Sequence, residues 1–425
     1  MIAGPLVRGA QRLNLVMWLS LAGVVAIAFN QSFHRSEPRD FLYFYAAGRI
    51  LDEYPAERLY DYGLQKTILQ QLLPMRPGVY GSFPYPPWVA VLFRPLAALS
   101  YWTAYRLWTI ATLILYLAGL SLLLSRFIGK DRLSQSILCC YGLSFWFFIS
   151  WMLLGGQISA IGFFGMALAI CLHDAGRRYA SGLALSLCLY KPTLLILVLP
   201  MLLVTRRFKT LAGFGLGAVG LAAIATLIEG RALWLIYPRV LMEYARYRSF
   251  LPLYNYVDIG AFSLMIGRKA ALLEMAAVAG AGAAALYLVW LWSQARRWGE
   301  EAPVTWLWAA TLTWTLVLNV YVPIYDCGLA VIAIIVTAPI LLRDAGRMFI
   351  ALCTLLLVSS YVTTLIAIRS DFQAITVLLA GLGTLQLKLL PRPPSTSGPS
   401  PPVLPRYRGF TVGSAGVDNC RQFAG

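Results

Sequence analysis

One aspartate in the sequence has the surroundings expected of a general base. Asp40, Tyr43 and Ala47 are spaced i, i+3 and i+7, which places them on one face of a helix. A carboxylate on such a face can take a proton from a hydroxyl group if burial or a partner adjusts its pKa. An aspartate after Pro38-Arg39 is also an ordinary helix cap. Asp40 is therefore either a catalytic base or a capping residue.

A single lysine interrupts an otherwise apolar stretch. Lys191-Pro192 lies near the middle of residues 179–205. An ammonium group inside a membrane costs about 2.5–3.5 kcal/mol on insertion scales, so a lysine there indicates a function. At a bend open to one membrane surface, Lys191 could bind a phosphate group. Pairing with a neighbouring carboxylate is the structural alternative.

Further polar and aromatic residues are candidates for substrate contact. Gln157 opens an apolar run, where it either contacts a ligand or makes an interhelical hydrogen bond. Tyr85 precedes two prolines, which force an extended backbone before a helix too short to span a membrane. Asp326 begins another apolar run, where it caps a helix or holds a sugar hydroxyl. The substrate-binding prediction comprises Tyr43, Tyr85, Gln157, Tyr325 and Asp326.

A second group of cations lies in the segment 229–270. This segment mixes tryptophan and tyrosine with arginines, among them Arg239 and Arg246. Such a composition is typical of an amphipathic helix at a membrane surface, where arginine binds anionic head groups. We therefore expect Arg239 and Arg246, with Lys191, to contact the phosphate or lipid of a donor. Simple anchoring to anionic lipid explains the arginines almost as well.

The composition requires that these residues be positioned by membrane helices. Of 425 residues, 59% are hydrophobic and only 12% are charged, and the mean hydropathy is +0.69. These values exclude a soluble enzyme, a disordered scaffold and a disulfide-rich secreted domain. The net charge of +17 comes from small groups of basic residues between apolar runs, which argues against nucleic-acid binding. The chain is predicted to be an all-α, polytopic membrane protein.

The apolar runs predict about twelve transmembrane helices. Ten candidate spans cover 13–30, 101–125, 133–153, 157–173, 209–228, 271–293, 304–321, 326–342, 347–368 and 372–390. The stretch 179–205 is flanked by basic residues on both sides. One span would place these two groups on opposite membrane faces, against the positive-inside rule. We therefore expect a hairpin of two short helices that meet at Lys191-Pro192.

The distribution of basic residues then predicts the sidedness. Fourteen lysines and arginines fall in the short loops on one side, and only Lys191 and Arg369 fall in those on the other. Both termini are therefore expected in the cytoplasm, with the long loops 31–100 and 229–270 on the outer face. Residues 1–390 form the predicted membrane domain. Residues 391–425 are rich in proline and serine and are expected to be a disordered cytoplasmic tail.

This topology gathers residues that are far apart in the sequence. Asp40, Gln157, Lys191 and Asp326 all fall on the outer side. A carboxylate base, a cation for phosphate and an amphipathic surface for lipid suit one class of reaction. That class is group transfer from a lipid-linked phosphate donor to an acceptor outside the cytoplasm.

Several short motifs also resemble a known family. They are Asp40 with Tyr45-Ala46-Ala47-Gly48; Leu59-Tyr60-Asp61; Tyr85-Pro86-Pro87 with Phe93-Arg94-Pro95-Leu96; Gly156-Gln157; Lys191-Pro192; and Tyr325-Asp326. In this order, over about residues 30–345, they resemble the polyprenyl-phosphate-dependent mannosyltransferase-like proteins of glycosyltransferase family 87, which have a GT-C fold. The resemblance implies an inverting transfer from a polyprenyl-phosphate sugar. It implies that Asp40 occupies the position of the family's proposed catalytic base and that Lys191 lies near the donor phosphate.

The resemblance also defines what is expected of partners and location. The acceptor is a lipid or a glycan, and the enzyme is a multi-pass protein of the inner (plasma) membrane with its active site on the periplasmic or outer face. Some family members use a histidine near the site, whereas this chain has only His34 and His173, so mannose is a guess at the sugar. No DxD or ExD pair lies near Asp40, and we expect no metal and no other cofactor.

A transporter or flippase for a lipid-linked saccharide is the main alternative. It needs the same lipid cleft and cations but no base, and it usually carries internal repeats or polar residues through the bundle. Here the candidate charged residues collect at the outer face, which favours the transferase.

Overall fold

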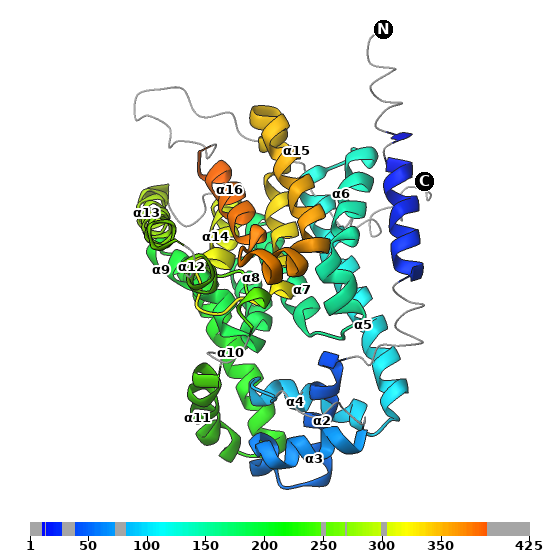
Figure 1. Ribbon diagram of the computed structural model, residues 1–425. Helices are drawn as coiled ribbons and strands as arrows, with labels where there is room; N and C mark the ends of the chain where they lie inside the picture. The colour runs from blue at the N-terminus through cyan, green and yellow to red at the C-terminus, as the bar shows by residue number, and fades with distance from the viewer. Residues whose placement is uncertain are drawn as a thin grey trace, which may run out of the picture. The chain divides into compact units, whose positions relative to one another are not determined.

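The computed structural model describes residues 11–12, 14–27, 39–72, 82–247, 252–267, 270–298 and 304–388. These residues belong to one compact unit, Met1–Leu390. The predicted tail 391–425 lies outside the described residues. The described part is helical and contains no strand, only an isolated antiparallel bridge between Tyr256 and Pro323 (Figure 1).

The α-helices follow the apolar runs of the sequence closely. They are α2 (Arg39–Glu53), α3 (Tyr62–Leu72), α4 (Pro87–Ala97), α5 (Tyr101–Leu123), α6 (Arg132–Ser144), α7 (Ser159–Asp174), α8 (Arg178–Leu185), α9 (Val198–Val204), α10 (Phe208–Glu229), α11 (Ala232–Tyr247), α12 (Ile259–Gly267), α13 (Ala271–Ala295), α14 (Thr305–Val317), α15 (Ala330–Ser370) and α16 (Ala374–Lys388). Their starts have local causes. Asp131 caps α6 by accepting from the N–H groups of Leu133 and Ser134, and proline suits the first turn of α4.

Among the residues that the structure describes, four helical segments are long and apolar enough to cross a membrane, judged by length and composition. They are Tyr101–Ile128, Phe208–Glu229, Ala271–Ala295 and Ile324–Ser370. The last contains a kink at Ala345, where φ is −147°, so it consists of two helices. The expected count of about twelve spans is not confirmed. Several predicted spans are broken into shorter pieces instead; 133–153, for example, becomes α6 and a π-helical turn, η3 (Phe148–Leu153).

The segment around Lys191 folds back on itself. The backbone leaves the helical conformation at Lys191, where φ is −143° and ψ is 85°. Before this break, Gly182 of α8 lies against Gly213 of α10, and Ser186 lies against Gly217. The matching order means that α8 and α10 run parallel. Because both helices start at the same end, the intervening residues 192–204 must return to it, which gives the hairpin expected from the loop charges.

A group of short helices from the predicted outer loops packs together beside the ends of α5 and α10 (Figure 1). Helices α2 and α4 meet closely at Gly48, where an added Cβ would lie 2.6 Å from the carbonyl oxygen of Phe93. An ion pair between Arg94 and Glu229 joins α4 to the end of α10 at 2.5 Å. This group carries Asp40 on α2 and Tyr85 just before α4.

Candidate functional site

A turn between η3 and α7 positions Asp40. The backbone N–H groups of Asp40 and Phe41 both donate to the carbonyl oxygen of Gly155, at 3.2 and 3.0 Å. The next residue, Gly156, has a φ of +72°, and an added Cβ there would lie 2.6 Å from the Cβ of Phe41. Only glycine fits this left-handed and crowded position. The indole N–H of Trp108 donates to the carbonyl of Gly156 at 2.8 Å and holds the turn from α5.

Asp40 lies inside the first turn of α2 rather than at the cap. The helix begins at Arg39, and the N–H groups of Asp40 and Phe41 in this turn donate to the Gly155 carbonyl. The Asp40 carboxyl is partly buried at this end of the helix. Tyr43 lies one turn further along α2, packed against the buried core.

Tyr85 contacts Gln157 and lies within the electrostatic influence of both carboxylates of the predicted site. Its hydroxyl donates to Oε1 of the buried Gln157 at 3.4 Å. Desolvation raises the pKa of Tyr85, and the charges of Asp40 and Asp326 raise it further. Both carboxylates thus act on one phenol, which remains protonated at neutral pH and donates its O–H to Gln157. The hydroxyl of Tyr60 donates to the Tyr85 carbonyl at 2.8 Å and fixes its backbone.

Lys191 is paired with Asp326. The ammonium donates to Oδ2 of Asp326, and the hydroxyl of Ser159 donates to Oδ1 at 3.1 Å. Both members are buried, with 8% of the Lys191 side chain and none of Asp326 exposed. The ammonium also lies over two rings, 4.7 Å from the centroid of Tyr321 and 4.8 Å from that of Tyr325. The pairing foreseen as an alternative for Lys191 is therefore present, and it leaves further N–H donors on the ammonium.

Residues 319–326 form a strap across Lys191, and hydrogen bonds hold it at several points. Asn319 donates to the carbonyl of Thr193 at 2.9 Å, next to the Lys191-Pro192 bend. The N–H of Val322 donates to the buried Asp258 at 3.1 Å, and its carbonyl accepts from Val257 at 2.9 Å. The strap thus ties the second outer segment to the hairpin, and it positions both tyrosine rings over the ammonium.

The two predicted donor arginines both belong to α11. Arg239 is exposed on α11. The backbone of Arg246 belongs to α11, but its side chain lies outside the described part of the chain. Both donor assignments stay predictions.

Three residues near the site were missed from the sequence. Tyr244 of α11 and Tyr321 share a hydrogen bond between their hydroxyls at 2.9 Å, and Asp258 holds the strap. Tyr244 also raises the pKa of Tyr85, so it lies close to the same group of residues. The only available signals were the aspartate before a helix start and the many tyrosines of 244–256 and 321–325, which are too common in interfacial segments to be specific.

The comparisons with known proteins connect this arrangement to one family. The model of glycosyltransferase family 87 matches residues 83–320, more than half of the chain. Tyr85, Gln157 and Lys191 fall within the match, whereas Asp40 and Asp326 lie outside it. No curated protein and no solved structure gave a match. The chain therefore belongs to glycosyltransferase family 87, and with its long apolar helices it is a membrane glycosyltransferase.

Proposed function

We propose that the chain transfers a hexose from a polyprenyl-phosphate sugar to a hydroxyl group of a lipid or glycan acceptor. The observation that carries this proposal is the grouping of Asp40, Tyr85 and the Lys191–Asp326 pair along residues 155–159, where Gly155 bonds to Asp40, Gln157 to Tyr85 and Ser159 to Asp326. A carboxylate and a cation are the two groups that such a transfer needs. Membership of the family supports a transferase over a transporter.

In this proposal, Lys191 acts on the leaving group. An ammonium has three N–H donors, and Asp326 and the two tyrosine rings fix its direction. The remaining donors and positive charge stabilise the negative charge that develops on the phosphate as the bond to the sugar breaks. Arg239 and Arg246 on α11 would hold the same lipid phosphate or its neighbours at the membrane surface.

Asp40 acts on the acceptor. Its carboxylate takes the proton of the acceptor hydroxyl, whose oxygen forms a bond to the anomeric carbon. The bond from this carbon to the phosphate oxygen breaks on the opposite side, so the anomeric configuration inverts and polyprenyl phosphate leaves. Tyr43, Tyr85, Gln157 and Tyr325 would bind the sugar and acceptor hydroxyls. Since phosphate is a good leaving group, no general acid is required.

We further propose that this chemistry takes place on the outer face of the plasma membrane, in a GT-C-type bundle with both termini in the cytoplasm. The excess of basic residues in the short loops on one side supports this sidedness. The hexose is mannose in the simplest form of the proposal, because the resembling proteins use it.

The test uses purified protein in lipid vesicles with radiolabelled polyprenyl-phosphate mannose and a panel of lipid and glycan acceptors. Loss of a general base lowers the rate by about 10²–10⁴-fold, so Asp40→Asn should retain about 1% of wild-type transfer or less. Asp52→Asn is the matched control, because Asp52 lies on the same helix and is half-exposed. Wild-type rates in Asp40→Asn would exclude Asp40 as the base.

A further inference from the structure

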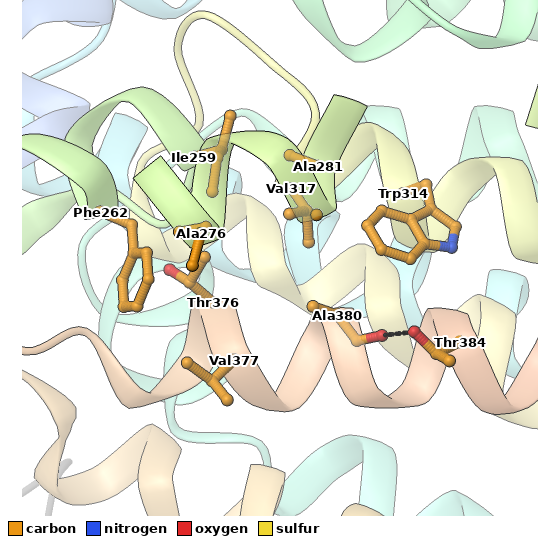
Figure 2. A pocket seen from close by; sticks show the side chains of 12 residues that line it. Ile259, Phe262, Ala276, Ala281, Trp314, Val317, Thr376, Val377, Ala380 and Thr384 are labelled. Atoms are coloured by element: carbon orange, nitrogen blue, oxygen red, sulfur yellow. Dashed lines mark hydrogen bonds between the residues drawn. The ribbon is translucent and has the colours of Figure 1, made fainter. Parts of the chain in front are cut away.

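A groove separates four helices in the second half of the chain. It has a volume of about 320 Å³, within the range of small-molecule sites, and Figure 2 shows its lining. Helices α12, α13, α14 and α16 contribute the lining residues, which are Ile259, Phe262, Ala276, Ala277, Gly280, Ala281, Trp314, Val317, Thr376, Val377, Ala380 and Thr384.

The chemistry of this lining selects hydrocarbon. Two threonine hydroxyls line the groove, and both donate to backbone carbonyls: Thr384 to Ala380 at 2.8 Å and Thr376 to Val257 at 2.8 Å. The first of these bonds is visible in Figure 2. The other side chains of the lining are aliphatic or aromatic, and among them the indole of Trp314 carries a polar N–H. A polar ligand would lose its hydration in this groove with only the unpartnered indole N–H of Trp314 to compensate, whereas an alkyl or isoprenoid chain has no polar groups to desolvate.

The packing of α13 explains why the groove exists and where it opens. The buried residues of α13 are Leu288, Trp292 and Ala295, all in its second half, and Trp292 donates to Thr311 of α14 at 3.1 Å. In the first half, Leu272 and Met275 are 80% and 67% exposed. Alanine and glycine on the inner side of this half leave a gap to α14 and α16. The groove therefore opens beside side chains that face the lipid.

The groove adjoins the Lys191 site along the chain. Val317 lines the groove, and four residues later Tyr321 lies over the Lys191 ammonium. On α16, the hydroxyl of Thr376 donates to the carbonyl of Val257. The N–H of Val257 in turn donates to the carbonyl of Val322 in the strap. Two separate connections thus lead from the lining to the strap, which makes a lipid whose head group is at Lys191 the natural occupant.

We propose that this groove holds the part of the donor's hydrocarbon chain that is nearest the phosphate. The inference rests on the proposed function, because it takes the donor to be lipid-linked. Since the surrounding bilayer is as apolar as the groove, transfer between them contributes little free energy. Van der Waals fit to the groove instead orients the chain and holds its phosphate at Lys191. The groove therefore acts on KM for long-chain donors.

Two glycines of α13 provide a matched pair of variants. Gly280 lines the groove and Gly282 does not, and an added Cβ would touch nothing within 4 Å at either position. Leucine at either site raises helix propensity equally, but only Gly280→Leu fills the groove. We expect Gly280→Leu to raise KM about three- to tenfold for a long-chain donor, a loss typical of a few packing contacts. KM for a donor analogue whose sugar phosphate carries only a methyl group should stay unchanged, as should both values in Gly282→Leu.

A second measurement does not depend on transfer. A photoreactive benzoylphenylalanine replaces Val377, which lines the groove, or Leu286, an exposed residue of α13 outside it. The probe is radiolabelled polyprenyl phosphate in phospholipid vesicles. Stronger labelling at 377 than at 286 supports the proposal. Equal labelling, or an equal rise in KM for both donors in Gly280→Leu, overturns it. Absence of sugar transfer by the wild type would instead contradict the proposed function, and the labelling would still decide the occupant.

Discussion

At the scale of single residues, the pair formed by Lys191 and Asp326 dominates the site. Two opposite charges in the interior are stable only while both are present, because each satisfies the other. Asp326 is further held by Ser159, and the Lys191 ammonium lies over two tyrosine rings. The ammonium is thus fixed in position before any substrate binds, which is the preorganisation that electrostatic catalysis needs.

Breaking this pair should cost stability as well as activity. Lys191→Met leaves Asp326 buried without a cation, and we expect the free energy of unfolding to fall by about 3–5 kcal/mol. The double variant Lys191→Met/Asp326→Leu should regain most of this stability but no transfer activity. Arg58→Met is the control, since its exposed pair with Asp61 contributes about 0–1 kcal/mol. Thermal unfolding in detergent measures all three. A double variant no more stable than the single one would contradict this account.

Tyrosine burial predicts a weakness at alkaline pH. Burial raises the pKa of Tyr60 above its ordinary value of 10.0, and Tyr85 and Tyr237 show the same direction. Above pH 10 the unfolded chain releases these protons while the folded protein keeps them, so stability falls as the pH rises. Tyr60→Phe should make this fall less steep. Unfolding midpoints between about pH 9 and pH 11 test it, and identical slopes for variant and wild type would refute it.

At the scale of elements, the site depends on a few close junctions between helices. The turn at Gly155-Gly156 accepts hydrogen bonds from the first turn of α2 and so positions Asp40. The strap 319–326 positions both tyrosine rings over Lys191. Neither junction is made by the carboxylate of Asp40 or the ammonium of Lys191. Changes at these positions should therefore alter the distance between Asp40, the proposed base, and Lys191 without removing either group.

Gly156→Ala tests the junction with α2. Its positive φ costs about 1–3 kcal/mol for alanine, and the added Cβ also collides with Phe41. Gly176→Ala is the matched control, because its φ is +79° but nothing lies within 4 Å. Both variants should lose stability, but only Gly156→Ala should displace Asp40 and reduce transfer. Equal activity of the two, measured at a temperature where both are folded, would show that the junction does not position Asp40.

At the scale of the whole molecule, much of the helical framework could be predicted from the sequence. Apolar runs placed most helices within a few residues, and loop charges indicated the fold-back at Lys191 because a local charge pattern determines local topology. The partner of Lys191 could not be assigned in this way, since Asp326 lies 135 residues away. Tyr244, Tyr321 and Asp258 were missed for the same reason. Their roles arise only from tertiary packing, which leaves no periodic signal.

The predicted sidedness can be tested in oriented membrane vesicles. In a background without the seven native cysteines, single cysteines replace Gly176, Arg206 and Glu57, all exposed. A hairpin puts positions 176 and 206 on one face, so an impermeant thiol reagent should label both from the same side and position 57 from the other. Labelling of 176 and 206 from opposite sides would mean that residues 178–205 cross the membrane once.

The separation of Lys191 and Asp326 along the chain also has a consequence for biogenesis. Ribosomes deliver a membrane protein from the N-terminus onward, so the hairpin containing Lys191 reaches the bilayer while Asp326, 135 residues later, is still unmade. During this interval the ammonium has no carboxylate partner and disfavours insertion by about 2.5–3.5 kcal/mol. The hairpin can therefore take up its final position only after the strap has been synthesised. A nascent chain released before Asp326 should be recognised and degraded as an incompletely inserted protein.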